Sequence, residues 1–120
     1  MGLIVNKVNL SNFIGYIGEV IVLLFLRLKL YNIIKHRYRC HLGEIDIIAC
    51  KKNKLLFVEV KTSLFSGEIP ISNFQRNAII SSAKYFISLN SKFQNFILSF
   101  DFCFLSLRRL PVYIENAWVE

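Results

Sequence analysis

The sequence lacks the cysteine pattern of a metal-binding or disulfide-linked module. Its three cysteines, Cys40, Cys50 and Cys103, are widely spaced and include no Cys-x-x-Cys pair. A structural zinc site needs further ligands at short spacing, and a disulfide framework normally uses an even number of cysteines. We therefore expect reduced thiols in a cytoplasmic protein, and no structural zinc.

Long apolar runs, internal repeats and low-complexity tracts are also missing. The most hydrophobic segment, Val20–Leu26, is far shorter than the roughly 20 apolar residues that a membrane-spanning helix needs. Glu19 precedes this segment and no small-residue cleavage site follows it, which argues against a signal peptide. The pattern predicts no stable insertion into a membrane.

Acidic residues are few. The chain has 8 Asp and Glu against 15 Lys and Arg, which gives a formal charge of +7, and 54% of its 120 residues are hydrophobic. This length and composition favour a single domain, residues 1–120, with one well-filled core. A basic field suits a polyanion such as DNA or, less specifically, an anionic membrane surface, although it can simply keep a hydrophobic domain soluble. Most of the cationic residues that create the local field are Lys35, Arg37, Arg39, Lys51, Lys52 and Lys54.

The segment from His41 to Lys61 predicts a β-hairpin. Two apolar runs, Ile45–Cys50 and Leu55–Lys61, are separated by a lysine-rich turn. Strand side chains alternate between the two faces of a sheet, so carboxylates on both strands can converge. The alternation places Glu44, Asp46 and Ile48 on one face of the first strand, and Phe57, Glu59 and Lys61 on one face of the second.

The remaining chain predicts helices on either side of this hairpin and further strands. Ser11 is a suitable N-cap for the first helix, which has apolar positions at Phe13, Ile17, Val20, Leu24 and Leu28 and is expected to be buried on more than one face. The second helix is capped by Ser72 or Asn73, with Phe74 on its buried side. The predicted elements are a helix over Asn12–Tyr31, a strand over Ile33–Arg39 with Ile34, His36 and Tyr38 on one face, the hairpin, a loop over Thr62–Pro70, a helix to about Asn90, a strand over Phe96–Leu107, a turn over Arg108–Pro111, and an edge strand over Val112–Val119 that begins near Pro111.

Asp46, Glu59 and Lys61 are the candidate chemical groups. Carboxylate oxygens bind hard cations, and Mg²⁺ takes one or two protein carboxylates together with substrate phosphate. A lysine two residues after Glu59 would face the same site and could stabilise charge on a phosphoryl oxygen. The alternative is an ordinary Glu–Lys pair worth about 0.2–1 kcal/mol, which a bare Glu-x-Lys pattern favours by itself.

Several motifs taken together carry a family resemblance. Gly18-Glu19 in the first helix, Gly43-Glu44-Ile45-Asp46 in a strand and Phe57-Val58-Glu59-Val60-Lys61 in the next resemble the PD-(D/E)XK nuclease superfamily. More narrowly, they look like the YraN family of small proteins related to archaeal Holliday-junction resolvases. The resemblance extends from about Gly15 to Asp101. It implies an α/β fold with a restriction-endonuclease-like core, in which helices flank a mixed sheet of four to five strands.

The resemblance also implies roles for individual residues. Asp46 and Glu59 would bind Mg²⁺ or Mn²⁺, the Val60 carbonyl would add a ligand, and Lys61 would be the catalytic lysine. Glu19 would supply a further acidic group from the helix; an exposed helix glutamate is the alternative. Two-fold dimers are typical of such resolvases, so a homodimer is a further expectation.

Some positions depart from the pattern or allow two interpretations. Gln75 stands where a lysine is typical, and it either contacts phosphate or has a structural role; Ser99 replaces an expected arginine. Glu44 is either an outer-layer residue of the metal site or a strand-edge residue. Asp101 is expected to be structural or to pair with a basic group. His36 and His41 are expected to be solvated, with a contact to phosphate as the alternative.

Three functional hypotheses follow. The first is a metal-dependent endonuclease that hydrolyses phosphodiester bonds in DNA, branched or otherwise structured, with an Mg²⁺-activated water, and uses Lys35, Arg37, Arg39, Lys51, Lys52 and Gln75 to bind the nucleic acid. The second is a non-catalytic nucleic-acid-binding protein that retains the nuclease fold. A weaker third is a domain that binds a membrane surface or another protein.

Overall fold

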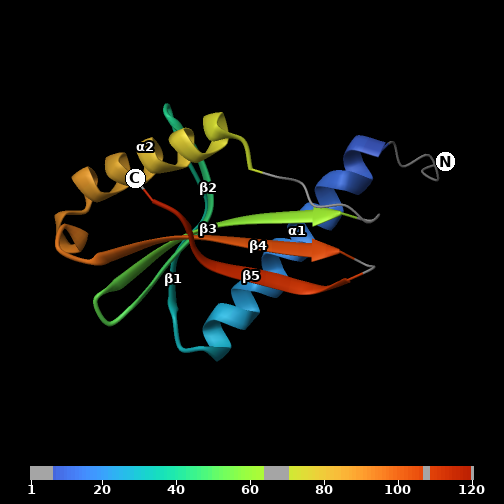
Figure 1. The fold of residues 1–120 in the computed structure, drawn as a ribbon, viewed down its shortest axis with the longest axis horizontal. Coiled ribbons are helices and arrows are strands. Elements are labelled where there is room, and N and C mark those ends of the chain that lie inside the picture. The colour runs from blue at the N-terminus through green and yellow to red at the C-terminus, as the bar shows by residue number, and fades with distance from the viewer. Residues whose placement is uncertain (1–6, 64–70, 107–108, 120) are drawn as a thin grey trace.

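The computed structural model describes residues 7–63, 71–106 and 109–119, which form two long helices and a five-stranded sheet (Figure 1). The strands lie in chain order, β1-β2-β3-β4-β5. β3 and β4 are parallel and all other neighbours are antiparallel, so the sheet is mixed. The elements are α1 (Lys7–Leu28), β1 (Asn32–Cys40), β2 (Gly43–Lys51), β3 (Lys54–Ser63), α2 (Asn73–Leu89), a short 3₁₀ helix η1 (Ser91–Phe93), β4 (Ile97–Ser106) and β5 (Arg109–Trp118).

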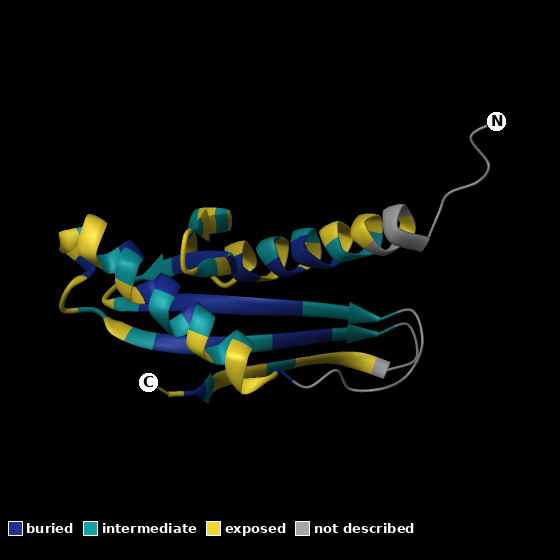
Figure 2. Ribbon diagram, turned by 90° about the horizontal axis from the view of Figure 1, so that it is seen from above, coloured by how far each residue is buried: buried dark blue, intermediate teal, exposed yellow. Residues whose placement is uncertain are grey.

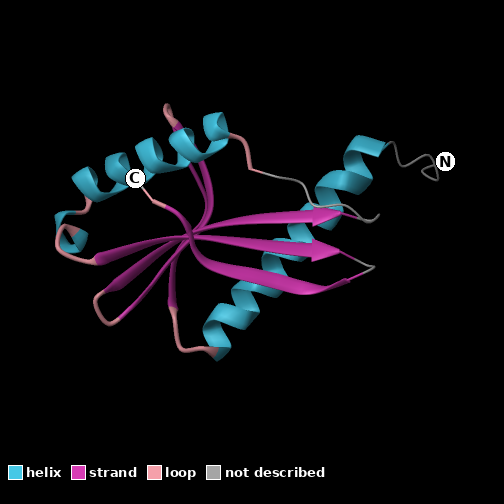
Figure 3. Ribbon diagram, in the orientation of Figure 1, coloured by secondary structure: helices cyan, strands magenta, loops and turns pink. Residues whose placement is uncertain are grey.

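The two helices cover opposite faces of the sheet (Figure 3). Alternation along the central strand β3 explains this arrangement, because successive side chains point to opposite faces. Leu55 and Phe57 pack with Phe86 of α2, whereas Leu56 and Val58 pack with Val22 of α1. The architecture agrees with the α/β, restriction-endonuclease-like core that the resemblance implied, with five strands.

Local sequence signals at the hairpin and at α2 are confirmed. The β2–β3 hairpin closes through Lys52 and Asn53, and Lys52 adopts a left-handed conformation with φ 55°. Ser72 caps α2: its Oγ accepts a hydrogen bond from Gln75 N at 3.1 Å, and Ser72 N donates to Gln75 Oε1 at 3.3 Å. This capping box fixes the start of α2 at the predicted position.

The predicted helix boundaries were wrong for α1. The helix begins at Lys7, so Ser11 lies within it and is not its N-cap, and it ends at Leu28, three residues before Tyr31. The prediction that α1 is buried on more than one face does not hold within one chain, since Phe13, Leu24 and Leu28 are exposed. Within the described residues, no helix is both long and apolar enough to cross a membrane.

Two other predictions were also wrong. Phe74 is 83% exposed, because it lies in the first turn of α2, away from the buried positions Ile79, Ala83 and Phe86. Pro111 lies inside β5, which already begins at Arg109, so the predicted turn is displaced; an edge strand tolerates the missing N–H. Of the predicted loop, Thr62 and Ser63 belong to β3, and its other residues, 64–70, lie outside the described part of the chain.

A close approach of α1 to β3 positions the N-terminal half of that helix. A Cβ atom at Gly18 would lie 2.1 Å from Thr62 Cγ2 and 3.2 Å from Leu105 Cδ1. A side chain at this position would force Thr62 or the helix to shift, so glycine permits the close contact. The adjacent residue, Glu19, is therefore held close to the sheet.

Candidate active site

The candidate site lies where β2 and β3 separate. The antiparallel pairing of these strands ends at Ile47 opposite Val58. Beyond this pair, Asp46 replaces the missing backbone partner, because its Oδ2 accepts a hydrogen bond from Val60 N at 2.8 Å. The strands therefore form a fork with a carboxylate at its centre, and the amide that the fork would leave unpaired is satisfied.

The faces of β2 differ from the predicted alternation at this fork. Ile48 packs on the α2 side with Ile45, whereas Ile47 packs on the α1 side. Side chains three residues apart cannot share a face of a regular strand, so the strand is distorted around Asp46. The alternation that the sequence predicts therefore breaks between Ile45 and Ile47, and Asp46 lies at this break.

Glu59 and Lys61 supply the second half of the site. Glu59 is buried, and Lys61 Nζ lies 3.4 Å from its Oε2. Both side chains lie on the face of β3 that Phe57 shares, as the two-residue period predicts. The predicted Glu-x-Lys contact is thus present, but it is partly buried rather than at the surface.

Burial and the neighbouring Glu59 carboxyl together raise the pKa of Asp46 to about 9, and Glu19 adds to the effect. The hydrogen bond from Val60 N opposes the shift without cancelling it. Two adjacent carboxyls in a partly buried site cannot both be ionised without a compensating positive charge. At neutral pH this pair therefore retains a proton or binds a cation.

Glu19 reaches the same region from α1. Its Oε1 accepts hydrogen bonds from Arg37 Nε at 2.9 Å and from His36 Nε2 at 2.8 Å, the latter with that ring nitrogen protonated. The hydrogen bond to Glu19 raises the pKa of Arg37. Glu19 is buried, so the alternative of an exposed helix glutamate is excluded.

The contacts of His36 and Arg37 depend on a local distortion of β1. Consecutive strand residues normally point to opposite faces, yet both of these side chains reach one carboxylate. Arg37 has φ 59°, a left-handed conformation that breaks the alternation. Consequently His36 faces α1 while Tyr38 packs against Phe86 of α2, and their predicted common face was wrong. His36, which the sequence predicts to be solvated with a phosphate contact as the alternative, has Glu19 as its partner instead.

A polar cavity of about 330 Å³ lies beside the fork. Acidic and basic side chains both line it, and it connects α1 to the start of β2. Glu59 and Lys61 do not line this cavity, so Asp46 links it to the Glu59–Lys61 pair. Its lining residues are Asn12, Gly15, Glu19, Arg37, Arg39, Glu44, Ile45 and Asp46.

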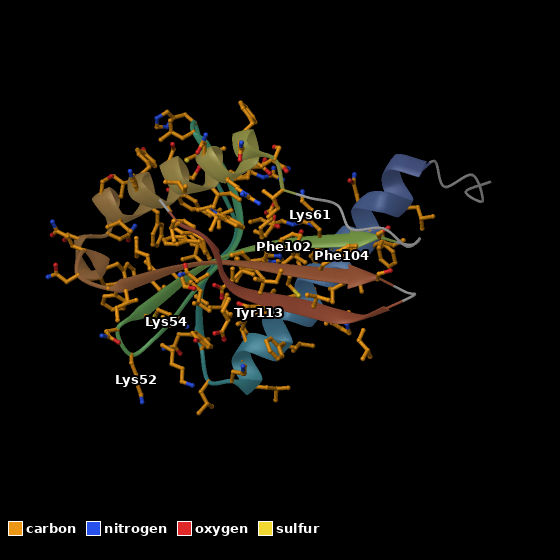
Figure 4. The ribbon with its side chains drawn as sticks, viewed as in Figure 1. Lys52, Lys54, Lys61, Phe102, Phe104 and Tyr113 are labelled. Atoms are coloured by element: carbon orange, nitrogen blue, oxygen red, sulfur yellow. The ribbon has the colours of Figure 1, made fainter. Side chains whose placement is uncertain are left out.

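The other predicted binding residues are divided between two ends of the molecule. Figure 4 shows Lys52 and Lys54 at the hairpin turn and Lys61 at the opposite end of β3. Lys51 Nζ donates to the Lys29 carbonyl at 2.8 Å, at the end of α1. Lys51 lies five positions after Asp46 along β2, which corresponds to a distance of about 17 Å. Arg37, Arg39 and the exposed Lys35 on β1 form the nearer group.

Three residues with alternative interpretations acquire structural partners. Glu44 pairs with Arg39 at 3.3 Å on the exposed edge while it also lines the cavity. Gln75 uses both its amide oxygen and its backbone N–H in the capping box of α2. Asp101 is structural as expected, but its partners are Ser99, Tyr113 and the amide of Asn116 rather than a basic group.

The donor set suits a hard divalent cation better than zinc. Among the described residues, no three or more His, Cys, Asp or Glu side chains gather closely enough to form a metal cluster by themselves. Structural zinc needs four such ligands, whereas Mg²⁺ takes one or two carboxylates and fills its remaining positions with water and phosphate oxygens. The two carboxyls of Asp46 and Glu59 fit the second case.

The chain matches one protein family, and the matched segment includes all the candidate residues. The family model described as "Uncharacterised protein family UPF0102" matches residues 18–105. The UPF0102 protein of Ehrlichia ruminantium (strain Gardel) is 57% identical over 109 residues, covering 91% of this chain and 86% of the relative. The relative from Ehrlichia chaffeensis is 52% identical, with 91% and 89% covered. One from Chelativorans sp. is 34% identical over 106 residues, with 87% and 86% covered.

Proposed function

Since the chain belongs to the uncharacterised protein family UPF0102, whose description names no activity, we propose from the site itself that it is a metal-dependent endonuclease-like protein that hydrolyses phosphodiester bonds in DNA. The observation that carries this proposal is the fork of β2 and β3. There, Asp46 and Glu59 lie together with Lys61 beside them, and the two carboxyls retain a proton that a metal ion can replace.

The carboxylate pair would hold Mg²⁺ or Mn²⁺, with the Val60 carbonyl as a further ligand. A bound ion of this kind polarises a phosphoryl oxygen and lowers the pKa of a coordinated water. The hydrogen bond from Val60 N fixes one oxygen of Asp46, and the ion would take the place of the proton that Asp46 shares with Glu59. The raised pKa of Asp46 would fall as the ion replaced the proton.

The other site residues would act on the substrate phosphate. Lys61, in contact with Glu59, would place its ammonium group next to a non-bridging phosphate oxygen and stabilise the charge that develops there. Arg37, oriented by Glu19, would contact the backbone next to the scissile phosphate from the cavity side. His36 would hold the same glutamate from the other side.

The basic side chains on β1 support DNA as the substrate. Lys35, Arg37 and Arg39 lie next to the acidic pair on one edge strand, and Lys51 and Lys52 extend the basic surface to the other end of the hairpin. Phosphate contacts of this kind position a duplex without reading its sequence. Branched or structured DNA is the preferred substrate on the resemblance to Holliday-junction resolvases of the PD-(D/E)XK superfamily, and a cytoplasmic location accords with it.

Cleavage assays with matched variants test the proposal. Wild-type protein, Asp46→Asn and Glu44→Gln are incubated with four-way-junction, flap and linear DNA in Mg²⁺ and in Mn²⁺. We expect metal-dependent cleavage by the wild type and by Glu44→Gln, whose carboxylate lies on the same strand but is exposed. Asp46→Asn should lower the rate at least about 1,000-fold. Cleavage by Asp46→Asn at the wild-type rate would contradict the assignment.

A non-catalytic nucleic-acid-binding protein is the second candidate. The involvement of Gln75 in the cap of α2, where a substrate-binding lysine is typical, favours it. This alternative predicts DNA binding that weakens steeply with salt, together with no cleavage in any divalent metal. Turnover that Asp46→Asn abolishes would exclude it.

A further inference from the structure

The outer face of α1 carries an apolar stripe with no partner within the described chain. Its residues recur at intervals of three and four, which places them on one side of a helix. Each is between 40% and 83% exposed, and Figure 2 shows the exposed residues along the outer side of α1. The outer stripe comprises Leu10, Phe13, Ile17, Ile21, Leu24 and Leu28.

The opposite side of α1 packs against the sheet. Gly18, Val22 and Leu26 are buried there. The other helix lacks a second apolar face, since the large exposed hydrophobic residues described in α2 are Phe74 and Leu89, one near each end. A helix that is apolar on two sides normally packs on both. Of the two long helices, α1 is therefore the one that carries a continuous exposed apolar stripe.

We propose that the outer stripe is the interface of a two-fold homodimer, in which α1 packs antiparallel against α1 of a second copy. The exposed area supports this occupant. An aromatic side chain presents about 150–250 Å² when fully exposed, and we take about the lower end of this range for leucine and isoleucine. At the observed exposures, the stripe with the flanking Tyr16 and Phe25 offers on the order of 800 Å² per chain, which is the share that each partner contributes to a standard interface.

The chemistry of the stripe also favours a second copy over a lipid surface. An isologous interface must be complementary to itself, and a purely apolar stripe meets that condition despite the net charge of +7. Between residues 10 and 28 the ionisable side chains other than tyrosine are Glu19, which is turned inward, and Arg27 at one end. A helix that binds an anionic membrane would have basic residues along the rim of its apolar face.

An apolar cavity beside the stripe adds a recess for such packing. It has a volume of about 360 Å³, and Ile17 and Ile21 of the stripe form part of its wall together with Leu105 and Pro111. Helices pack by inserting the ridges of one into the grooves of the other. The stripe thus provides a ridge, and the cavity beside it provides a groove that can accept the ridge of the second copy. The cavity that contains Glu19 and Asp46 lies on the other side of α1, so dimer formation leaves it open.

Sedimentation equilibrium on the full chain tests this proposal. The wild type should have twice the monomer mass of 14.0 kDa, and Leu24→Glu should raise the dissociation constant at least about 100-fold, because each substitution occurs twice in the interface. Leu89→Glu, the same change at an exposed position of α2, is the matched control and should leave the dimer intact. Circular dichroism establishes that the variants are folded; Leu28→Glu, at the exposed helix end, replaces Leu24→Glu if the latter is not.

Two results would overturn the dimer. One is a wild-type protein that remains monomeric at about 100 µM, where a standard interface is occupied. If that monomer also co-sediments with vesicles of phosphatidylglycerol and phosphatidylcholine, the stripe binds membranes instead. The other is a dimer whose dissociation constant Leu24→Glu leaves unchanged. These readouts are masses, so they are independent of whether the protein cleaves DNA.

Discussion

Two acidic regions lie in the sheet, one on β4 and the other on β2 and β3, and they differ in the groups that face them. Asp101 on β4 accepts hydrogen bonds from Ser99 Oγ at 2.5 Å, Tyr113 Oη at 2.5 Å and Asn116 N at 3.0 Å. Asp46 on β2 accepts one, from Val60 N, and faces a second carboxyl. A carboxylate with three donors is satisfied by the protein itself, whereas the Asp46–Glu59 pair, even with Lys61 beside Glu59, retains a proton or binds a cation at neutral pH.

This difference separates a structural carboxylate from a functional one more clearly than burial does. Asp101 is 1% exposed and is the more deeply buried of the two, yet it ties β4 to β5 and has no role left to fill. Burial and Asp101 together raise the pKa of Tyr113, so its hydroxyl remains a donor. The less buried Asp46 is the residue at which the fold leaves charge uncompensated.

The largest expected effect is on stability at Asp101. In Asp101→Asn an amide nitrogen would replace one of the oxygens that face three donors. We expect the free energy of unfolding to fall by about 3 kcal/mol. Urea denaturation measures this change. A loss below about 0.5 kcal/mol would mean that the three hydrogen bonds do not distinguish the two acidic regions.

The next effect concerns the ammonium group of Lys61, which lies beside Glu59. Lys61→Met keeps the length of the side chain and removes its charge, so metal binding should persist while the cleavage rate falls about 100-fold. The measurement is single-turnover cleavage of a labelled DNA at saturating Mn²⁺. An unchanged rate would remove Lys61 from the proposed chemistry and leave it as a structural partner of Glu59.

The same substitution that destabilises at Asp101 should stabilise at Asp46. In Asp46→Asn the amide oxygen still accepts from Val60 N, and the new N–H group can donate to Glu59. Asparagine is uncharged like the protonated Asp46, so the variant no longer has to take up a proton on folding, and its free energy of unfolding should rise by about 1–2 kcal/mol in metal-free buffer. Denaturation in EDTA measures this effect. A destabilised Asp46→Asn would show that the pair is not electrostatically frustrated.

The last effect, which is small within any single pH unit, is the pH dependence of that difference. Because the folded pKa of Asp46 is raised to about 9, the folded state binds more protons than the unfolded state between about pH 4 and pH 9. The Asp46 contribution to stability therefore falls as pH rises through this window, by at most about 1.4 kcal/mol per pH unit. The stability advantage of Asp46→Asn over the wild type should grow over the same range. A stability difference between Asp46→Asn and the wild type that stays constant from pH 5 to pH 8 would contradict the raised pKa of Asp46.

Features set by neighbouring residues were predictable from the sequence. The hairpin followed from alternation on both sides of a polar turn, and the start of α2 from Ser72. The Glu59–Lys61 contact followed from a two-residue spacing on one strand. The mixed sheet between two helices followed from the order of these elements.

Features that depend on long-range pairing or on one unusual backbone angle were not predictable. The left-handed conformation of Arg37 reverses the face of His36, and no local pattern announces it. The fork that turns Asp46 toward Val60 depends on where the β2–β3 pairing stops. Tyr113 reaches Asp101 from another strand. The outer stripe of α1 gave the expected helical spacing, but spacing cannot tell which apolar face meets the sheet.

Metal binding by the carboxylate pair is the central claim, and isothermal titration calorimetry with Mn²⁺ tests it most directly. Wild type, Asp46→Asn and Glu44→Gln are titrated in the same chelator-treated buffer, without DNA. We predict one Mn²⁺ site per chain in the wild type and in Glu44→Gln, proton release on binding, and no site in Asp46→Asn. Equal Mn²⁺ binding by all three proteins, or none by the wild type, would contradict the assignment of Asp46 and Glu59.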